Sequence, residues 1–362
     1  MTRRPWQILV IACLGIACSG LSGCGWSRSA VGWISSAAAQ GTPVWTGPKT
    51  PMKLGVTGRP DSAFLMLALH RGYFDQHGIQ IETVTGGSGN EFVAPLAQDR
   101  IQAASGSLNA ALFNALNRGV DIRIVADFTH LGGEGDGLAS IMARADLMDS
   151  GAIRSPADLK GKEISLGFGR GHYSYLMART MLARAGLTFA DVTLRNMSTP
   201  DSLVALSNKV IDASFVIEPL VTAALRQNIA RILVKGGAVE PGAQLAVLVF
   251  SPEFARQSDA ATRVLMAYLR GARDYHDAFV AGKDRDAAIA ILTRTLPVRD
   301  PEIWKVAMPQ QIDLNGRVNV ADIKRQAAAY KELGDITGPV PDIDKYVDHR
   351  FSEEAVKVVG VR

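Results

Sequence analysis

The chain has 362 residues, of which 47% are apolar, and a formal net charge of +4 at pH 7. This length and apolar content predict a globular protein with a large core, arranged as two domains or one large domain. The composition excludes collagen-like, disordered and disulfide-scaffold proteins. The sequence contains no basic run interleaved with aromatic residues, so we expect no nucleic-acid partner.

The N-terminus is typical of an export signal. Arg3 and Arg4 precede the apolar run 8–17, which is too short to span a bilayer but has the length of a signal-peptide core. The next motif, Leu21-Ser22-Gly23-Cys24, resembles the bacterial lipobox. We therefore predict a signal peptide over 1–23.

The lipobox resemblance implies that Cys24 is lipidated and becomes the first mature residue. The alternative is cleavage after Ala39, at a small-residue site of the kind that a soluble periplasmic protein uses. The segment 24–51 is rich in Gly, Ser, Ala, Thr and Pro and has no sustained period, so we expect a flexible tether there.

All three cysteines, Cys13, Cys18 and Cys24, lie in the first 24 residues. This distribution argues against a disulfide framework, a zinc site or a cysteine nucleophile in the folded part of the chain. No H-E-x-x-H pair, Walker lysine pattern or G-x-S-x-G elbow occurs either. We expect no metal and no cofactor.

Strand and helix signals alternate through residue 234, which favours an α/β fold with largely parallel sheets covered by helices. Strands are expected near 53–56, 79–84, 100–104, 121–126, 138–143, 163–168, 192–196, 213–217, 231–234 and 245–250. Only helices follow the last strand, over 258–281, 284–295, 302–308 and 320–333.

Several motifs in this order carry a family resemblance. Gly72-Tyr73-Phe74 and His77-Gly78-Ile79 precede the second strand, Asp158-Leu159-Lys160-Gly161-Lys162 forms a turn, and Asp212-Ala213 is followed by Glu218-Pro219. Together these motifs resemble the substrate-binding proteins of ABC importers related to sulfonate, taurine, nitrate and thiamine-pyrimidine binders. Asp99 and Gln102 stand where that family usually has Gly and Asp. The resemblance covers about 52–336.

The resemblance implies a two-lobed periplasmic-binding-protein fold of type II, with two segments that cross between the lobes. We expect the first lobe over 52–141 plus 248–335, the second over 142–247, and a C-terminal tail over 336–362. The natural crossings are 138–143 and 245–250.

Ligands in such sheets bind beyond the carboxyl ends of the strands, where short loops lead into helices. Loops rich in Gly, Ser and Thr occur at 57–62, 86–90, 105–109 and 169–174, and they bring hydroxyls and backbone N–H groups to a ligand. The expected ligand-binding residues are Thr57, Arg59, Ser62, Ser107, Gly169, His172, Tyr173 and Glu218.

Each of these residue types has its own expected role. Ser107 is expected at a helix N-cap, where it serves helix and ligand alike. Arg59 and His172 can donate to an anionic group, and Tyr173 can pack over a ligand and donate its hydroxyl. Glu218 either accepts from a ligand N–H or acts in lobe closure.

The resemblance implies a solute-binding protein that is not an enzyme and works as a monomer with an ABC permease and its ATPase. Its expected solute is a small organic anion such as a sulfonate, and the alternative is a pyrimidine or another aromatic solute. A thiamine-pyrimidine synthase shares the fold, but the cysteine-rich motif of that enzyme is absent after Cys24. A binding domain that feeds a sensor is a third hypothesis.

We predict that Cys24→Ser moves the protein from the membrane fraction to the soluble periplasm, because the substitution removes the thiol that would carry the lipid. Fractionation followed by immunoblotting measures this, with the unaltered chain as control. Retention of the variant in the membrane fraction would contradict lipidation at Cys24.

Overall fold

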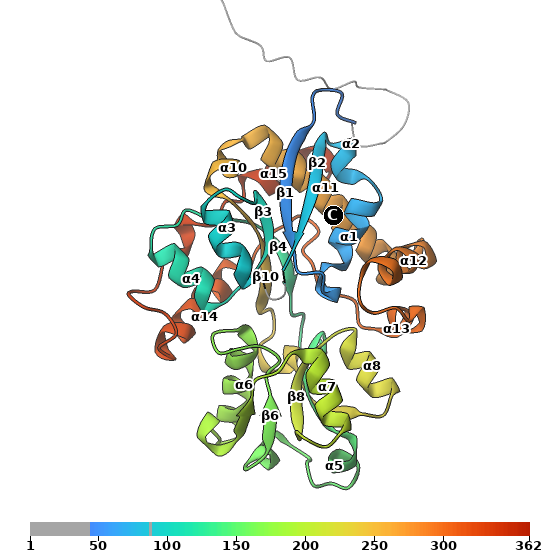
Figure 1. Ribbon diagram of the computed structural model, residues 1–362, viewed down its shortest axis with the longest axis vertical. Coiled ribbons are helices and arrows are strands. Elements are labelled where there is room, and N and C mark those ends of the chain that lie inside the picture. Colours follow the sequence, from blue (N-terminus) through green and yellow to red (C-terminus); the bar gives the residue numbers. More distant parts are fainter. Residues whose placement is uncertain (1–43, 87–88) are drawn as a thin grey trace, which may run out of the picture. The chain divides into compact units, whose positions relative to one another are not determined.

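The computed structural model describes residues 44–86 and 89–362 (Figure 1). These residues belong to one compact unit. The predicted signal peptide 1–23, the lipidation site Cys24 and most of the tether 24–51 lie outside the described residues.

Two five-stranded sheets form the framework. The first sheet has the order β2-β1-β3-β10-β4. Its strands are β1 (Thr50–Val56), β2 (Ile79–Thr85), β3 (Ala103–Ser107), β4 (Arg123–His130) and β10 (Gln244–Phe250). The second sheet has the order β7-β6-β8-β5-β9. Its strands are β5 (Ala139–Arg144), β6 (Glu163–Ser165), β7 (Thr193–Arg195), β8 (Ala213–Ile217) and β9 (Ala230–Lys235).

In each sheet four of the five strands run in the same direction. β1 pairs in parallel with β2 and β3, and β10 is antiparallel to its neighbours β3 and β4. The second sheet repeats this pattern, with β6 parallel to β7 and β8 and with β5 as the antiparallel strand. The predicted α/β class with largely parallel sheets is confirmed, and each of the ten expected strands is present within a few residues of its expected position.

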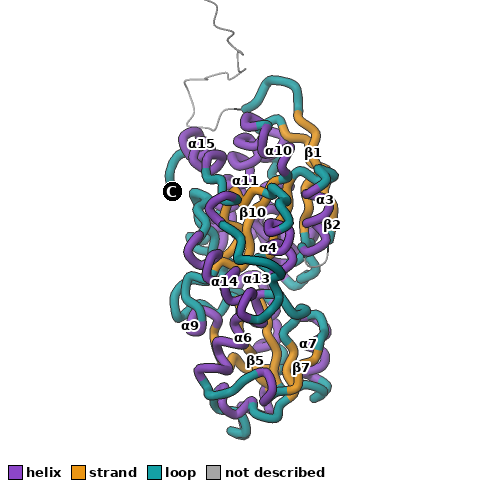
Figure 2. Tube along the Cα trace, turned by 90° about the vertical axis from the view of Figure 1, so that its left-hand side faces the viewer, coloured by secondary structure: helices purple, strands orange, loops and turns teal. Residues whose placement is uncertain are grey.

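Helices cover the sheets on both faces (Figure 2). The helices that accompany the first sheet are α1 (Ala63–His70), α2 (Tyr73–Gln76), α3 (Val93–Ala97), α4 (Ala110–Asn117), α10 (Pro252–Arg256), α11 (Ser258–Phe279), α12 (Arg285–Thr295), α13 (Pro301–Val306), α14 (Val320–Glu332) and α15 (Arg350–Val359). Those that accompany the second sheet are α5 (Ala145–Asp149), α6 (Tyr173–Arg184), α7 (Thr199–Ser207) and α8 (Leu220–Arg226), and α9 (Gly236–Val239) follows β9. Short 3-10 turns lie at Pro60–Ser62, Asn90–Phe92, Pro156–Leu159, Phe189–Asp191 and Ile343–Lys345.

The central strand β10 shows why its sheet is covered on both sides. Leu248 and Phe250 pack into the core beneath α1 and α11, whereas Val247 and Val249 pack into a second core beneath α4 and α14. Alternate side chains of a strand point to opposite faces, so an unbroken apolar run requires cover on each face. The run 245–250 meets this requirement.

The chain passes between the sheets in two segments. It leaves the first sheet after His130 and returns at Gln244, so the connections are 131–138 and 236–243. Lobe 1, as the sheets define it, comprises 44–130 and 244–362, and lobe 2 comprises 139–235. The segments expected as crossings, 138–143 and 245–250, form strands that pair within a single sheet, and the connections lie immediately before them.

Two regions expected to lie outside the lobes contribute to lobe 1. At the N-terminal side, the Trp45 N–H donates to the Gln76 carbonyl at 2.8 Å, so part of the segment expected as tether contacts the body. At the C-terminal side, the range expected as a tail contains α15, whose buried Phe351 packs on Phe250 with ring centroids 5.6 Å apart. Burial of these aromatic side chains favours the ordered arrangement.

The two connections lie against each other. Leu131 donates its N–H to the Ala243 carbonyl at 2.8 Å, and Gly242 donates to the Gly132 carbonyl at 3.0 Å. A Cβ atom added at Gly237 would lie only 2.0 Å from the backbone oxygen of Gly133. The backbones therefore meet at a distance that only glycine permits at this position.

We predict that Gly237→Ala lowers the free energy of unfolding by about 1–3 kcal/mol, because the new methyl group collides with the backbone of the other connection. Urea denaturation measures this. Gly135→Ala is the matched control, because its Cβ would meet no heavy atom within 4 Å. Equal midpoints for the two variants would show that the connections do not constrain each other.

Candidate functional site

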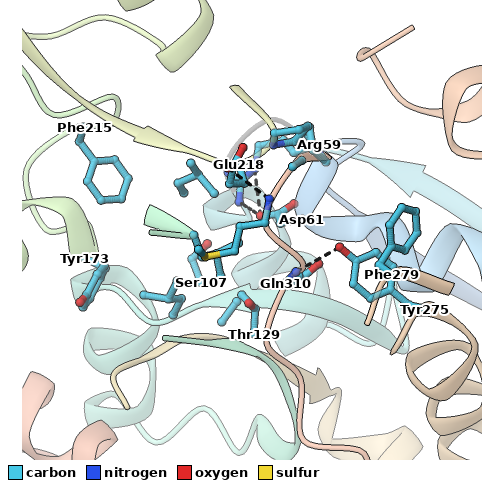
Figure 3. A pocket seen from close by; sticks show the side chains of 18 of the residues that line it. Arg59, Asp61, Ser107, Thr129, Tyr173, Phe215, Glu218, Tyr275, Phe279 and Gln310 are labelled. Atoms are coloured by element: carbon cyan, nitrogen blue, oxygen red, sulfur yellow. Dashed lines mark hydrogen bonds and ion pairs between the residues drawn. The ribbon is translucent and has the colours of Figure 1, made fainter. Parts of the chain in front are cut away.

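A cavity lies where the carboxyl ends of strands from both sheets face each other (Figure 3). Its volume is about 40 Å³. Lobe 1 contributes Arg59, Pro60 and Asp61 after β1, Ser107 of β3, Thr129 of β4, Leu245 and Ala246 of β10, Tyr275 and Phe279 of α11, and Trp304, Ala307, Met308 and Gln310. Lobe 2 contributes His172 and Tyr173 at the start of α6 and the run Phe215, Ile217, Glu218 and Pro219, and Leu138 comes from the first connection. This inner pocket is our candidate ligand site.

Five of the eight predicted ligand-binding residues line the inner pocket: Arg59, Ser107, His172, Tyr173 and Glu218. The other three do not. Thr57 and Ser62 are buried beside the pocket, and their hydroxyl oxygens lie 3.1 Å apart. Gly169 lies in the loop before α6. A ligand contact by these three residues stays a prediction.

Ser107 is the last residue of β3 and lines the inner pocket, but it does not cap the next helix. The N-cap of α4 is Asn109, whose side-chain oxygen accepts from the Leu112 N–H at 2.9 Å. The expectation that Ser107 is an N-cap was therefore wrong, because the helix begins at Ala110, after two further residues of extended chain.

Arg59 is held by an acid of its own loop. Its guanidinium donates from Nη2 to Asp61 Oδ2 at 2.5 Å, and Asp61 Oδ1 also accepts from the Thr57 hydroxyl at 3.1 Å. The same guanidinium lies 5.2 Å from the centroid of the Phe168 ring, so it bridges from lobe 1 to lobe 2. Asp61 offsets the charge that Arg59 brings to the pocket.

His172 is an uncharged N-cap. Its Nδ1 accepts from the Ser174 N–H at 3.2 Å, which leaves Nε2 to carry the proton, and its ring stacks on Phe168 with centroids 4.0 Å apart. Burial, and then the charge of Arg59, lowers the pKa of His172 to about 3. The imidazole can therefore donate one neutral hydrogen bond, but it brings no positive charge to a ligand at neutral pH.

Tyr173 lines the inner pocket with its ring. Its hydroxyl points away from the middle of the pocket in Figure 3. Burial, and then the neighbouring Glu240 carboxylate, raises the pKa of Tyr173 well above its usual range. The expected packing against a ligand fits this geometry, whereas donation by the hydroxyl would require another rotamer.

Glu218 joins the two lobes. Its carboxylate accepts from the N–H and hydroxyl of Thr222, both at 3.0 Å, and from the Met308 N–H of lobe 1 at 3.3 Å. Burial raises the pKa of Glu218, although these hydrogen bonds lower it. Of the two roles considered for this residue, lobe closure fits these contacts better than acceptance from a ligand.

Besides Asp61, three polar residues that line the inner pocket were not predicted from the sequence: Thr129, Tyr275 and Gln310. Thr129 Oγ1 and Gln310 Oε1 are buried and have no hydrogen-bond partner among the described residues. The Tyr275 hydroxyl accepts from the Gln310 N–H at 3.1 Å, so its own proton is available for donation, and burial raises its pKa to about 12. Buried polar groups normally find partners, and a ligand in this pocket would supply them.

A signal for Thr129 existed, since it lies near the carboxyl end of β4, where ligand contacts are expected. Tyr275 and Gln310 gave none. Tyr275 lies on the long helix α11, and Gln310 follows α13 in an irregular segment. Nothing local in the sequence places either residue beside the strand ends.

The fold places the chain in the class of two-lobed periplasmic-binding-protein folds. The aliphatic sulphonate-binding protein of Escherichia coli superposes with a TM-score of 0.67 at 20% identity, over 84% of this chain and 93% of that chain. The alkanesulfonate-binding protein of Xanthomonas axonopodis pv. citri, bound to MOPS, superposes with a TM-score of 0.65 at 18% identity, over 84% of this chain and 100% of that chain. The nitrate-binding protein of Synechocystis PCC 6803 superposes with a TM-score of 0.70 at 16% identity, over 87% of this chain and 90% of that chain.

The sequence itself matches the model of the NMT1/THI5-like family over residues 59–278, which is more than half of the chain. The protein belongs to this family. No curated protein sequence matches the chain. Within residues 44–86 and 89–362, no helix has the length and apolarity needed to cross a membrane.

We predict that His172→Asn makes the protein less sensitive to acid. The neutral form of His172 is favoured by folding, so its contribution to stability is complete above the unfolded pKa of about 6.5 and is lost as the pH falls towards 3. Asparagine keeps a side-chain oxygen at the N-cap but does not titrate. Thermal denaturation between pH 7 and pH 3 should show a smaller loss of Tm for the variant, and parallel curves would contradict this account.

Proposed function

We propose that this protein is the solute-binding component of an ABC importer, which captures a small organic solute between its lobes and delivers it to a membrane permease with its ATPase. The observation that carries this proposal is an inner pocket lined from both lobes at the carboxyl ends of their strands. Three neighbours in fold are described as binding proteins for alkanesulfonates, aliphatic sulphonates or nitrate.

The proposed location is the periplasm, with the protein acting as a monomer tethered to a membrane through a lipid on Cys24. The sequence motifs of the N-terminus support this location. An importer component and a sensor domain are distinguished by their partner protein. Co-purification with a permease would identify this protein as an importer component.

Binding without reaction is the proposed activity. His172 uses Nδ1 to cap α6, Asp61 is paired with Arg59, and Glu218 accepts three hydrogen bonds from its own chain. None of these side chains is placed as a general base beside a nucleophile. The arrangement instead supports closure on a ligand, whose contacts offset the free energy of bringing the lobes together.

The first candidate ligand class is a small organic anion, sulfonate-like, as the sequence resemblance implies. Its oxygen atoms would accept from the hydroxyls of Ser107, Thr129 and Tyr275 and from the neutral imidazole of His172. Such donors can hold an anion without a full opposing charge, through dipoles and hydroxyls.

The second class is a neutral aromatic solute, such as a pyrimidine, and the charge balance of the inner pocket favours it. The described lining contains one guanidinium, Arg59, and two carboxylates, Asp61 and Glu218. An anion buried here without a net positive environment would lose much of its hydration free energy. The rings of Phe215, Tyr275 and Phe279 offer faces and edges on which a flat solute can pack.

A thermal-shift screen of sulfonates, carboxylates, nitrate and pyrimidines tests both classes, because stabilisation grows with affinity for the native state. In the presence of the best compound, Ser107→Ala and Thr129→Ala should each weaken binding by roughly two- to tenfold, which corresponds to one lost hydrogen bond. Neither should change the Tm of the free protein much.

The control is Ser150→Ala, a substitution of an exposed serine outside the inner pocket. An unchanged ligand-induced shift in Ser107→Ala and Thr129→Ala would refute their assignment. A screen in which no compound of any class stabilises the protein would refute the proposed function.

A further inference from the structure

A second cavity lies beside the inner pocket. It measures about 290 Å³ and shares Arg59, Pro60, Asp61, Ile217 and Glu218 with the inner pocket. This outer compartment has its own wall of apolar residues from both lobes: Phe168, Pro200 and Leu220 from lobe 2, and Pro297 and Val298 from lobe 1. We propose that it receives an apolar tail, several carbons long, of the solute whose polar head occupies the inner pocket.

The proposal rests on the proposed function, and the sizes of the two cavities support it. The volume of the inner pocket is about 40 Å³ and that of the outer compartment about 290 Å³, so a substituent that does not fit beside the head has room in the outer compartment. Five residues, Ile217 among them, line both cavities, so the two lie side by side, and the proposed tail would pass from one to the other at this shared boundary.

The chemistry of the outer wall favours a tail without polar atoms. Two residues with hydroxyls, Ser198 and Thr199, also line it, and the Ser198 hydroxyl donates to Asp201 Oδ2 at 2.6 Å and accepts from the Asp201 N–H at 3.3 Å. The carboxylate of Asp61 is paired with Arg59, and that of Glu218 accepts hydrogen bonds from Thr222 and Met308. Ser198, Asp61 and Glu218 therefore already have partners, so an apolar tail leaves these three side chains satisfied.

Phe168 links the two compartments. Its ring lies beneath the guanidinium of Arg59 at 5.2 Å and stacks on the ring of His172, which lines the inner pocket. A tail that crosses this boundary therefore passes along an aromatic ring. Contact of this kind gains free energy from apolar burial in both lobes, so tail binding also favours lobe closure.

The test compares ligands that share a head and differ in chain length. Calorimetric titration with methanesulfonate, butanesulfonate and hexanesulfonate covers the anionic head, and benzamide, 4-butylbenzamide and 4-hexylbenzamide cover the neutral head. For whichever head binds, we expect affinity to rise roughly two- to fourfold for each added methylene up to butyl, as burial of hydrocarbon predicts. The heat-capacity change should also become more negative.

The variant Leu220→Ser removes an apolar side chain from the outer wall, and it should reduce the affinity ratio between the butyl and the shortest member roughly tenfold. Leu225→Ser is the matched control, because Leu225 lies on the same helix, is 38% exposed and does not line either cavity. This control should leave the ratio unchanged. The ratio itself shows that each variant still folds and binds.

The possible outcomes distinguish the proposal of a bound tail from the proposed function. Equal affinity for short and long members in the unaltered protein would overturn the tail and leave the proposed function intact. An unchanged affinity ratio in Leu220→Ser would show that the tail binds elsewhere, and it would overturn the assignment of the tail to the outer compartment. Binding by no member with either head would overturn the proposed function and the tail with it.

Discussion

The close contact between the two connecting segments sets the geometry on which the pocket depends. Backbone hydrogen bonds from Leu131 to Ala243 and from Gly242 to Gly132 hold the connections side by side. The Asp136 carboxylate accepts from the Gly132 and Leu138 N–H groups, at 2.5 and 2.7 Å, and so shapes the first connection from within. Because these bonds form within a few residues, they position one lobe against the other while the strand ends beyond them stay accessible to a ligand.

Contacts between the lobes also form far from the connections. Arg170 of lobe 2 pairs with Asp335 of lobe 1 at 2.6 Å, and the Ala110 N–H donates to the Gly171 carbonyl at 3.0 Å. The Arg170 side chain is 66% exposed, whereas that of Asp335 is only 9% exposed, so this ion pair is partly buried. At the pocket, Glu218 makes a buried contact with Met308. In the proposed function, a ligand adds its own contacts to these, and this difference in contacts is what would shift the population towards the closed form.

The sequence predicted the framework because its signals were local. Alternating apolar runs placed all ten strands, and strand ends followed by Gly- and Ser-rich loops led to Ser107 and His172. The sequence did not predict residues whose position at the pocket depends on contacts with distant parts of the chain. Tyr275 reaches the inner pocket because α11 packs across the sheet, and its hydroxyl meets the N–H of Gln310, 35 positions later in the chain. The exact crossings also depended on pairing between distant strands, which apolar runs alone do not specify.

The charge that a ligand meets in the inner pocket depends on the partners of the charged side chains as well as on their number. Arg59 suggested an anion site, yet Asp61, two positions later, takes up its guanidinium. Burial lowers the pKa of His172 to about 3, so its neutral form prevails at pH 7, and the Glu218 carboxylate accepts from N–H and hydroxyl donors of its own chain. What the inner pocket then offers a ligand is hydroxyl donors, the Gln310 oxygen and aromatic rings. A head that both donates and accepts hydrogen bonds without net charge satisfies these groups at a lower desolvation cost than an anion does, and the apolar outer compartment adds affinity through burial of a tail.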